Sequence, residues 1–324
     1  MLKDKNILIT GGTGSFGRKV VDYILNNMSP KKLIIFSRDE LKQFDMQQVY
    51  SAELFPSIRF FIGDIREKER LMRAMHGVNY VIHTAALKQV PTAEYNPFEA
   101  VRTNVIGTQN IINAAIECGV EKVVALSTDK AVNPVNLYGA TKLCMEKLII
   151  AGNSYAGGRT RFSVVRYGNV VGSRGSVIPL FLKQSKCGEL TVTDERMTRF
   201  WITLENAVSF VLKCLKNMHG GEIFIPKISS MMVIDLAKTI CPQCNIKITE
   251  IRPGEKLSEV LISSDESRHT LDAGDYFVIL PEFKTWEGVS WQEGTQLPEG
   301  YSYNSSENDV WLSMEDMKYL IREK

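Results

Sequence analysis

The stretch "ITGGTGSFGRKVVDYIL", residues 9–25, runs from an apolar segment through closely spaced glycines into an amphipathic segment. Gly11, Gly14 and Gly17 form the pattern G-x-x-G-x-x-G. Glycines let backbone amides approach a pyrophosphate closely, and the N–H groups and dipole at a helix N-terminus favour an anion. Because the motif lies between a predicted strand and a predicted helix, the stretch predicts a dinucleotide-binding turn.

Outward from this turn, the first half of the chain alternates apolar runs with helix-like stretches. The predicted strands are residues 6–10, 32–37, 58–63, 80–85, 122–128 and 162–168. They are almost continuously apolar, as parallel strands covered on both faces are. Residues 97–118 begin with a proline and end before Gly119, which are typical signals of a helix start and stop. The alternation predicts an α/β fold, a Rossmann-type doubly wound parallel sheet.

After about residue 172 the pattern loosens. Helix-like stretches at 177–188, 204–218 and 314–324 are mixed with strand-like stretches at 190–194 and 197–203 and with loops rich in Gly, Pro and Ser. We expect residues 1–172 to form the Rossmann domain and residues 173–324 to form mainly a smaller C-terminal substrate-binding lobe. Later segments can return to the first domain.

Composition excludes several classes of protein. The chain has 324 residues, 44% of them hydrophobic, which suits one large domain or two modest ones. A net charge of +2 gives no basic field for a nucleic acid. The longest apolar runs are strand-length, far short of the roughly 20 residues of a membrane span, and the N-terminus lacks a signal-peptide core. We therefore expect a cytoplasmic protein with no nucleic-acid or membrane partner.

The cysteines are scattered, and Cys241-Pro-Gln-Cys244 is the one CxxC motif among them. A structural zinc site needs four ligands, usually from two such pairs, and no histidine cluster lies near this pair. We interpret the pair as a feature of a loop and expect no metal site.

The end of the second predicted strand indicates which cofactor binds. A Rossmann strand that ends in an acidic residue usually holds the ribose 2′-hydroxyl of NAD, but here the run passes into Ser37 and Arg38. Arginine suits a 2′-phosphate, and Lys42 lies one turn further on. Asp39 is expected to cap the next helix. The sequence therefore favours NADP.

Other strand ends complete the predicted cofactor site. Asp64 follows the third strand, near the expected position of the adenine. Ala85 and Ala86 follow the fourth strand, where small residues can pack on the cofactor. We interpret His83 as a packed strand residue. The expected cofactor-binding residues are Gly11, Thr13, Gly14, Ser15, Phe16, Gly17, Ser37, Arg38, Lys42, Asp64, Ile65, Ala85, Ala86, Lys88, Thr128, Tyr138 and Lys142.

The segment "STDKAVNPVNLYGATK", residues 127–142, carries the predicted chemistry. Tyr138 and Lys142 are four residues apart on a predicted helix and so face the same side. A lysine ammonium stabilises a phenolate and is expected to lower the Tyr138 pKa. Tyr138 can then take a hydroxyl proton while hydride leaves the same carbon for NADP⁺.

The glycine motif and the Tyr-x-x-x-Lys pair resemble those of the extended short-chain dehydrogenase/reductase superfamily. The segments "LSTDKAVNPVNLYGATK", "RYGNVVGSRGSVIP", "RMTRFWIT" and "RPGEKLSEV" are similar to those of the soluble UDP-N-acetylglucosamine 4,6-dehydratases, especially the 5-inverting enzymes that open the pseudaminic acid pathway. The resemblance covers essentially the whole chain. Gln89 and Ser258 depart from it, since relatives often have His there.

The resemblance implies catalytic roles for Asp129, Lys130, Tyr138 and Lys142. Oxidation at C4 makes the C5 hydrogen of the sugar acidic; Lys130 is then the base at C5, and Asp129 is the acid that protonates the departing O6. Lys130 must be partly neutral for this role, although an ionised Asp129 raises its pKa. Proton sharing between the two side chains is therefore expected.

The second lobe is expected to hold the nucleotide diphosphate of UDP-N-acetylglucosamine. Arginine forks match diphosphate oxygens bidentately. The expected substrate-binding residues are Lys88, Asn169, Arg174, Val177, Thr191, Arg199, Arg252 and Glu255. The resemblance also implies tightly bound NADP that is regenerated in each turnover, and a homo-oligomer, either a dimer or a hexamer.

Three other functions remain open at this stage. A C5-retaining 4,6-dehydratase shares the whole residue set, although Tyr138 favours the inverting group, because related dehydratases can have Met there. A nucleotide-sugar 4-epimerase shares Tyr138, Lys142 and the cofactor but has no need of an Asp-Lys pair. A non-enzymatic NADP-binding sensor would be expected to lose Tyr138 or Lys142, and this chain keeps both.

Overall fold

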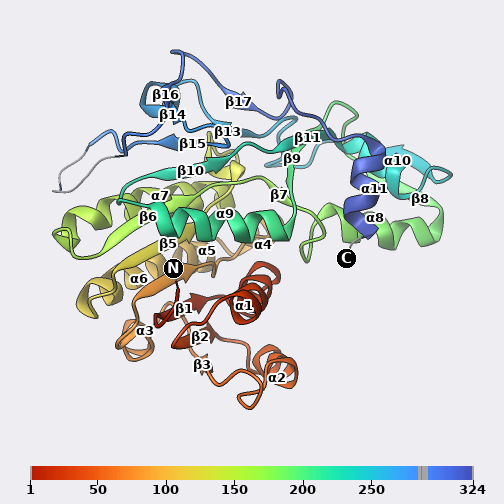
Figure 1. The fold of residues 1–324 in the computed structure, drawn as a ribbon. Helices are drawn as coiled ribbons and strands as arrows, with labels where there is room; N and C mark the ends of the chain where they lie inside the picture. Colours follow the sequence, from red (N-terminus) through yellow and green to blue (C-terminus); the bar gives the residue numbers. More distant parts are fainter. Residues whose placement is uncertain (1, 284–285, 287–290, 323–324) are drawn as a thin grey trace.

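The computed structural model describes residues 2–283, 286 and 291–322, and Figure 1 shows its arrangement. The helices are α1 (Ser15–Asn27), α2 (Glu40–Val49), α3 (Lys68–Met75), α4 (Val90–Tyr95), α5 (Pro97–Val101), α6 (Gly107–Glu117), α7 (Leu137–Ala156), α8 (Val177–Gln184), α9 (Leu204–Asn217), α10 (Val233–Ile240) and α11 (Met314–Arg322). Shorter helical turns are η1 (Arg102–Ile106), η2 (Asp129–Ala131), η3 (Ser185–Cys187) and η4 (Glu266–His269).

Among the described residues, the main sheet has ten strands in the order β16-β14-β15-β10-β6-β5-β4-β1-β2-β3. They are β1 (Asn6–Thr10), β2 (Lys32–Ser37), β3 (Ile58–Ile62), β4 (Tyr80–His83), β5 (Lys122–Leu126), β6 (Arg161–Val165), β10 (Ile223–Pro226), β14 (Thr270–Asp272), β15 (Tyr276–Ile279) and β16 (Thr295–Gln296). The run from β3 to β10 is parallel, whereas β15, β14 and β16 pair antiparallel. The order 3-2-1-4-5-6 confirms the predicted Rossmann-type doubly wound sheet.

A hydrophobic core lies on each face of this sheet. One core joins the strands to α3, α6 and α7, and the other joins them to α1 and α9. The strands are buried on both faces because helices cover both, which explains their nearly unbroken apolar sequences.

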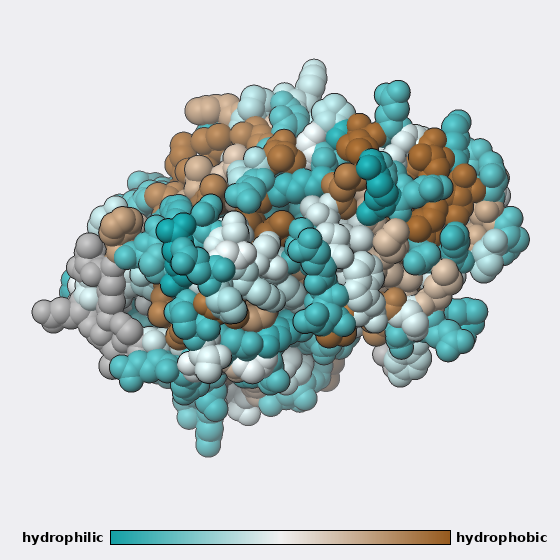
Figure 2. All heavy atoms as spheres, turned by 90° about the horizontal axis from the view of Figure 1, so that it is seen from above, coloured by the Kyte–Doolittle hydropathy of each residue, from teal (hydrophilic) through white to brown (hydrophobic). Residues whose placement is uncertain are grey.

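The smaller lobe has its own core, formed by α8, α10, α11 and short strands. These strands are β7 (Asn169–Val170), β8 (Glu189–Val192), β9 (Thr198–Ile202), β11 (Ser229–Met232) and β12 (Asn245–Ile248), and β13 (Val260–Ile262) pairs with β17 (Tyr303–Asn304) beside them. Figure 2, a view from above, shows apolar side chains in several patches, one of them at the end of the molecule that holds this lobe. Leu182 and Ile248 are among its exposed large hydrophobic residues.

Two segments differ in detail from the sequence-based expectations. The helix predicted at 97–118 is interrupted by the π-helical turn η1. The helix predicted at 204–218 is α9, and it packs on α1 and the main sheet instead of within the small lobe. After residue 172 the chain returns to the main sheet with β10, β14, β15 and β16. The boundary between the two parts at residue 172 remains a prediction.

Candidate active site

A pocket of about 570 Å³ lies at the carboxyl edge of the parallel strands, a size typical of small-molecule sites. It is lined by the turn after β1, the ends of β2, β4 and β5, the start of α7 and the segment 167–176 that leads into the small lobe. Every residue of the expected cofactor set lines it, from Gly11 to Lys142. Whether each of these residues binds the cofactor remains a prediction.

The glycine turn is shaped for an anion. Gly11 has a φ of +67°, and a Cβ there would lie 2.8 Å from the Ala85 backbone. A Cβ on Gly17 would lie 2.6 Å from the Gly11 carbonyl oxygen, so the helix can approach the turn only with glycine there. Gly14 is the N-cap of α1, and no side chain of the described residues makes a capping hydrogen bond to the helix. The first turn of α1 therefore keeps backbone N–H groups for a phosphate, and these residues fit a dinucleotide.

Ion pairs shape the end of the pocket beyond β2. Asp39 accepts a hydrogen bond from the Lys42 backbone N at 3.0 Å, which confirms its predicted role as a helix cap, and it also pairs with the Lys42 ammonium. Arg38 is half-exposed and lies 3.6 Å from Asp64. Burial raises the pKa of Asp64, but hydrogen bonds from Arg66 and the charge of Arg38 outweigh burial and lower it.

Helix α7 carries Tyr138 and Lys142 into the pocket. Asn136 caps it by accepting from the Gly139 backbone N at 2.8 Å, and the Asn136 amide donates to the Gly254 carbonyl at 2.8 Å. Burial raises the Tyr138 pKa to about 12, against the effects of Lys130 and Thr128. Burial lowers the Lys142 pKa to about 8.

The expectation that Lys142 lowers the Tyr138 pKa is therefore wrong for this structure. The Lys142 ammonium donates to the Leu126 carbonyl, and burial dominates the ionisation of the phenol. Tyr138 is a neutral hydroxyl here, ready to donate or accept a hydrogen bond.

The turn η2 places Asp129 and Lys130 directly after β5. Gly139 makes this possible, because a Cβ there would lie 2.1 Å from the Lys130 carbonyl oxygen. Asp129 is fully buried, accepts from the Thr128 hydroxyl at 2.9 Å and pairs with the Lys130 ammonium at 2.9 Å. The structure thus brings the predicted acid and base within one hydrogen bond of each other, close to the helix that carries Tyr138.

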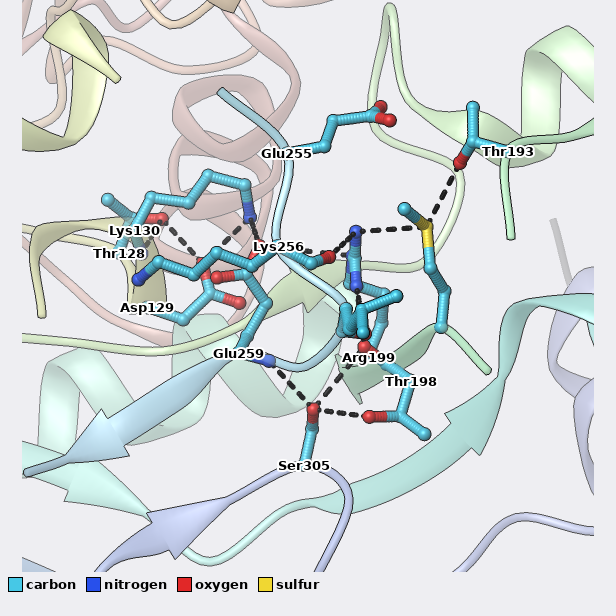
Figure 3. Close-up of polar contacts among 12 residues, drawn as sticks. Thr128, Asp129, Lys130, Thr193, Thr198, Arg199, Glu255, Lys256, Glu259 and Ser305 are labelled. Carbon is cyan, nitrogen blue, oxygen red and sulfur yellow. Dashed lines mark hydrogen bonds and ion pairs between the residues drawn. The ribbon is translucent and has the colours of Figure 1, made fainter. Parts of the chain in front are cut away.

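Glu259, which sequence reasoning missed, is a second buried carboxylate beside Lys130. Its Oε1 lies 3.2 Å from the Lys130 Nζ (Figure 3). Burial lowers the Lys130 pKa, but Asp129 and Glu259 together outweigh burial and raise it. Lys130 is therefore an ammonium in this structure, and it needs a proton transfer to a neighbour before it can act as a base. The one sequence signal for Glu259 is a charged residue at the start of an apolar strand.

The expected substrate-binding residues fall into two groups. Lys88, Asn169 and Arg174 line the pocket, whereas Val177, Thr191, Arg199, Arg252 and Glu255 are not among its lining residues. Thr191 accepts from the Gln184 amide at 2.8 Å within the small lobe. Arg252 is half-exposed, 3.8 Å from Glu255.

Arg199 is buried, and its guanidinium is hydrogen-bonded to backbone carbonyl groups. Its guanidinium donates to the carbonyls of Thr198 at 2.7 Å, Leu257 at 3.1 Å and Lys256 at 3.0 Å. Arg199 therefore holds the 252–259 loop in place, and its predicted role as a diphosphate clamp remains untested.

Two further buried residues support the pocket. Asn104, in the π-helical turn, accepts from the Leu87 N at 2.8 Å and donates to the Thr141 hydroxyl at 3.0 Å, which ties the loop after β4 to α7. His83 lies 2.7 Å from the Thr10 hydroxyl, and burial lowers its pKa to about 3. The interpretation of His83 as a packed strand residue is confirmed.

The CxxC pair forms a disulfide between Cys241 and Cys244, with a Cα–Cα distance of 5.3 Å, at the end of α10. Within the described residues there is no group of three or more His, Cys, Asp or Glu that could hold a metal ion. Across the same part of the chain, no helix combines the length and the apolar character needed to cross a membrane.

The strand order, the glycine turn and the Tyr-x-x-x-Lys helix define a Rossmann fold of the short-chain dehydrogenase/reductase type. The chain belongs to the polysaccharide biosynthesis protein family, whose family model matches residues 7–281. It is 53% identical to a UDP-N-acetylglucosamine 4,6-dehydratase (inverting) of Campylobacter jejuni, across 99% of this chain and 98% of that protein. This identity confirms the resemblance drawn from the motifs, and with it the expectation of an enzyme.

Two other similarities bear on the assignment. The chain is 43% identical to a UDP-glucose 4-epimerase of Rickettsia rickettsii, across 99% of this chain and 96% of that protein. The X-ray structure of Pen from Bacillus thuringiensis has a TM-score of 0.91 and 40% sequence identity, and the match covers 100% of this chain and 98% of that one.

Proposed function

We propose that this chain removes water across C5 and C6 of UDP-N-acetylglucosamine after transient oxidation at C4, and inverts C5. The product is UDP-2-acetamido-2,6-dideoxy-β-L-arabino-hexos-4-ulose. The observation that carries the proposal is the Asp129–Lys130 pair, held at 2.9 Å at the carboxyl end of β5 beside the helix that bears Tyr138. The identity to the inverting dehydratase of Campylobacter jejuni supports it.

In this proposal Tyr138, Lys130 and Asp129 each carry out one part of the reaction. Tyr138 first loses its hydroxyl proton to solvent, and the phenolate then takes the proton of the C4 hydroxyl. A proton passes from the Lys130 Nζ to the Asp129 Oδ1, which leaves an amine and a carboxylic acid. Lys130 then takes the C5 proton and Asp129 protonates O6, which departs as water. Finally the intermediate rotates, Lys130 returns its proton to the opposite face of C5, and the proton held by Tyr138 restores the Lys130 ammonium. Because the intermediate rotates between the two steps, one position of the Lys130 Nζ serves both the basic and the acidic step.

The cofactor in this proposal is NADP, bound tightly and restored in each turnover. The nicotinamide, when bound, supplies the oxidation at C4 and the matching reduction at C6. The N-terminus of α1 would hold the pyrophosphate, and Arg38, with Lys42 beside it, would hold the 2′-phosphate. Arg38 supports the choice of NADP because its side chain is half-exposed at the end of β2, with only Asp64 at 3.6 Å as an ion-pair partner among the described residues.

The rest of the proposal rests on the family resemblance. The UDP moiety would lie toward the small lobe, with Lys88, Asn169 and Arg174 on the pocket wall, and we propose Arg252 as a further contact to the diphosphate. We propose a cytoplasmic enzyme that opens the pseudaminic acid pathway, and a homo-oligomer, either a dimer or a hexamer.

The deciding experiment is incubation with UDP-N-acetylglucosamine without added cofactor, followed by NMR of the product at early times. A 4-keto-6-deoxy sugar with L-arabino coupling constants is expected, and in D₂O it should carry deuterium at C5, since a lysine ammonium exchanges its protons with solvent. A D-xylo product would refute inversion while leaving dehydration standing. Early sampling matters because the C5 proton beside a ketone stays acidic.

A 4-epimerase is the second candidate, favoured by the relative named UDP-glucose 4-epimerase. Epimerisation needs Tyr138 and the cofactor but neither an acid for O6 nor a base for C5. A product that keeps its 6-hydroxyl and has an inverted C4 would favour this candidate and overturn dehydration.

A further inference from the structure

Glu259 lies directly before β13 and is 3% exposed. Its backbone is fixed on both sides, because its N–H donates to the Ser305 hydroxyl at 2.9 Å and its carbonyl accepts from the Ser305 N–H at 2.9 Å. The Ser305 hydroxyl also bonds the Thr198 hydroxyl at 2.7 Å. A carboxylate held in this way has a defined position relative to the pocket.

Its side chain points toward two cations. The Glu259 Oε1 lies 3.2 Å from the Lys130 Nζ and 3.8 Å from the Arg199 Nε, as Figure 3 shows. The other oxygen, Oε2, is buried and has no hydrogen-bond partner among the described residues. A buried carboxylate with an unpaired oxygen is costly to keep for stability alone, so its contact with Lys130 calls for a functional explanation.

The Lys130 Nζ therefore has two carboxylates within ion-pair distance, and only one of them can keep its charge through the proposed reaction. Asp129 becomes neutral when it takes up the proton that it delivers to O6. At that moment Asp129 no longer holds the Lys130 side chain by charge. Glu259 exchanges no proton in this scheme and lies 3.8 Å from the Arg199 Nε, so its carboxylate can hold the Nζ throughout.

We propose that Glu259 is a positioning residue for proton transfer at C5, an inference that rests on the proposed dehydratase function. It fixes the Lys130 Nζ at the pocket wall while the charge of Asp129 changes. It also stabilises the ammonium that forms when Lys130 takes the C5 proton, because an opposite charge at close range favours the charged form of an amine. No bond forms or breaks at Glu259 itself.

The test is Glu259→Gln, which keeps the size of the side chain and removes its charge. Exchange of the C5 proton is measured by NMR on the isolated 4-keto-6-deoxy product in D₂O, a reaction that needs neither oxidation at C4 nor loss of O6. C5 exchange and kcat for dehydration should each fall about 10- to 100-fold, the scale of general acid–base assistance. Formation of reduced cofactor and KM should change less than about threefold, so reduced cofactor should accumulate.

Two variants serve as controls. Glu307→Gln changes an exposed carboxylate two residues beyond Ser305 and should leave both rates unchanged. Glu259→Asp restores the charge on a shorter stem and should recover part of the C5 exchange. The inference is overturned if Glu259→Gln exchanges C5 within twofold of the wild type, or if C5 exchange and cofactor reduction fall by the same factor.

If Glu259→Gln does not fold, Glu259→Asp carries the test. A larger loss in C5 exchange than in cofactor reduction supports the inference, and equal losses overturn it. Failure of the proposed function would be seen separately, as a wild-type protein that makes no 4-keto-6-deoxy product.

Discussion

Gly139→Ala should disable the catalytic turn while leaving the fold intact. A Cβ at this position would lie 2.1 Å from the Lys130 carbonyl oxygen, whereas ordinary contacts begin near 3.4 Å. The turn η2 must therefore move away from α7 by roughly 1 Å, and it carries Asp129 and Lys130 with it. A misplacement of about 1 Å in an active site can cost about 100-fold in rate. We expect kcat for dehydration to fall by about that factor.

Stability should change little, because alanine favours a helix over glycine by about 1 kcal/mol, and this gain offsets part of the strain. The assay is kcat by NMR alongside thermal unfolding. Gly152→Ala is the matched control: it lies on the same helix, far from the turn, and its Cβ would meet the Ile112 side chain at 3.1 Å. It should keep its kcat. A folded Gly139→Ala protein with kcat within twofold of the wild type would refute the argument that this glycine positions the turn.

Three further predictions concern the pocket. Arg38→Ala should weaken NADP binding about tenfold relative to NAD binding. This factor corresponds to the low end of the roughly 1.5–3 kcal/mol of a charge-assisted hydrogen bond, because the side chain is half-exposed. Equal losses for both cofactors in a titration would contradict this prediction. Lys130→Met should still allow reduced cofactor to form, seen by absorbance, but yield no 6-deoxy product, whereas Tyr138→Phe should impair the first step; near-normal product from Lys130→Met would exclude Lys130 as the base. Because burial lowers the Lys142 pKa to about 8, its ammonium is lost as pH rises through 8. Single-turnover cofactor reduction should fall above that pH, and Lys142→Arg should move the fall to higher pH.

The fold was largely predictable because the hydrophobic pattern of the strands and the glycine motif both indicate the same parallel sheet. Strands covered on both faces are apolar throughout, and the glycine turn identifies β1 and α1 without reference to the rest of the chain. The later strands of the main sheet were not predicted. The strands β14 and β15 are short, and they join the sheet through antiparallel pairing to β10, across a lobe that interrupts the sequence. Such pairings depend on tertiary packing, which a local pattern does not encode.

The site was predictable to the extent that motifs cover it. The residues of the glycine turn, the strand ends and α7 all line one pocket, as their positions in a doubly wound sheet require. The contacts that fix their chemistry join distant segments. Glu259 reaches Lys130 from the segment just before β13, and Asn136 bonds the Gly254 carbonyl. The ionisation of Tyr138 was misjudged for the same reason: its pKa is raised mainly by burial, which outweighs the charge of Lys130 and is set by the whole fold.

The burial of charge also bears on which reaction the site performs. Asp129 and Glu259 are both almost fully buried, and each has one oxygen without a partner among the described residues. Replacing buried ion pairs by apolar residues is often neutral or stabilising, so such groups are weak evidence of a structural role. A 4-epimerase needs no proton donor for O6 and no base for C5, and would gain nothing from this arrangement. A dehydratase needs an acid and a base that exchange one proton, together with an anion that stays charged during the exchange. Asp129, Lys130 and Glu259 match the acid, the base and the anion that a dehydratase needs. The chain is similar both to a protein named as a dehydratase and to one named as an epimerase, and we favour dehydration on this ground.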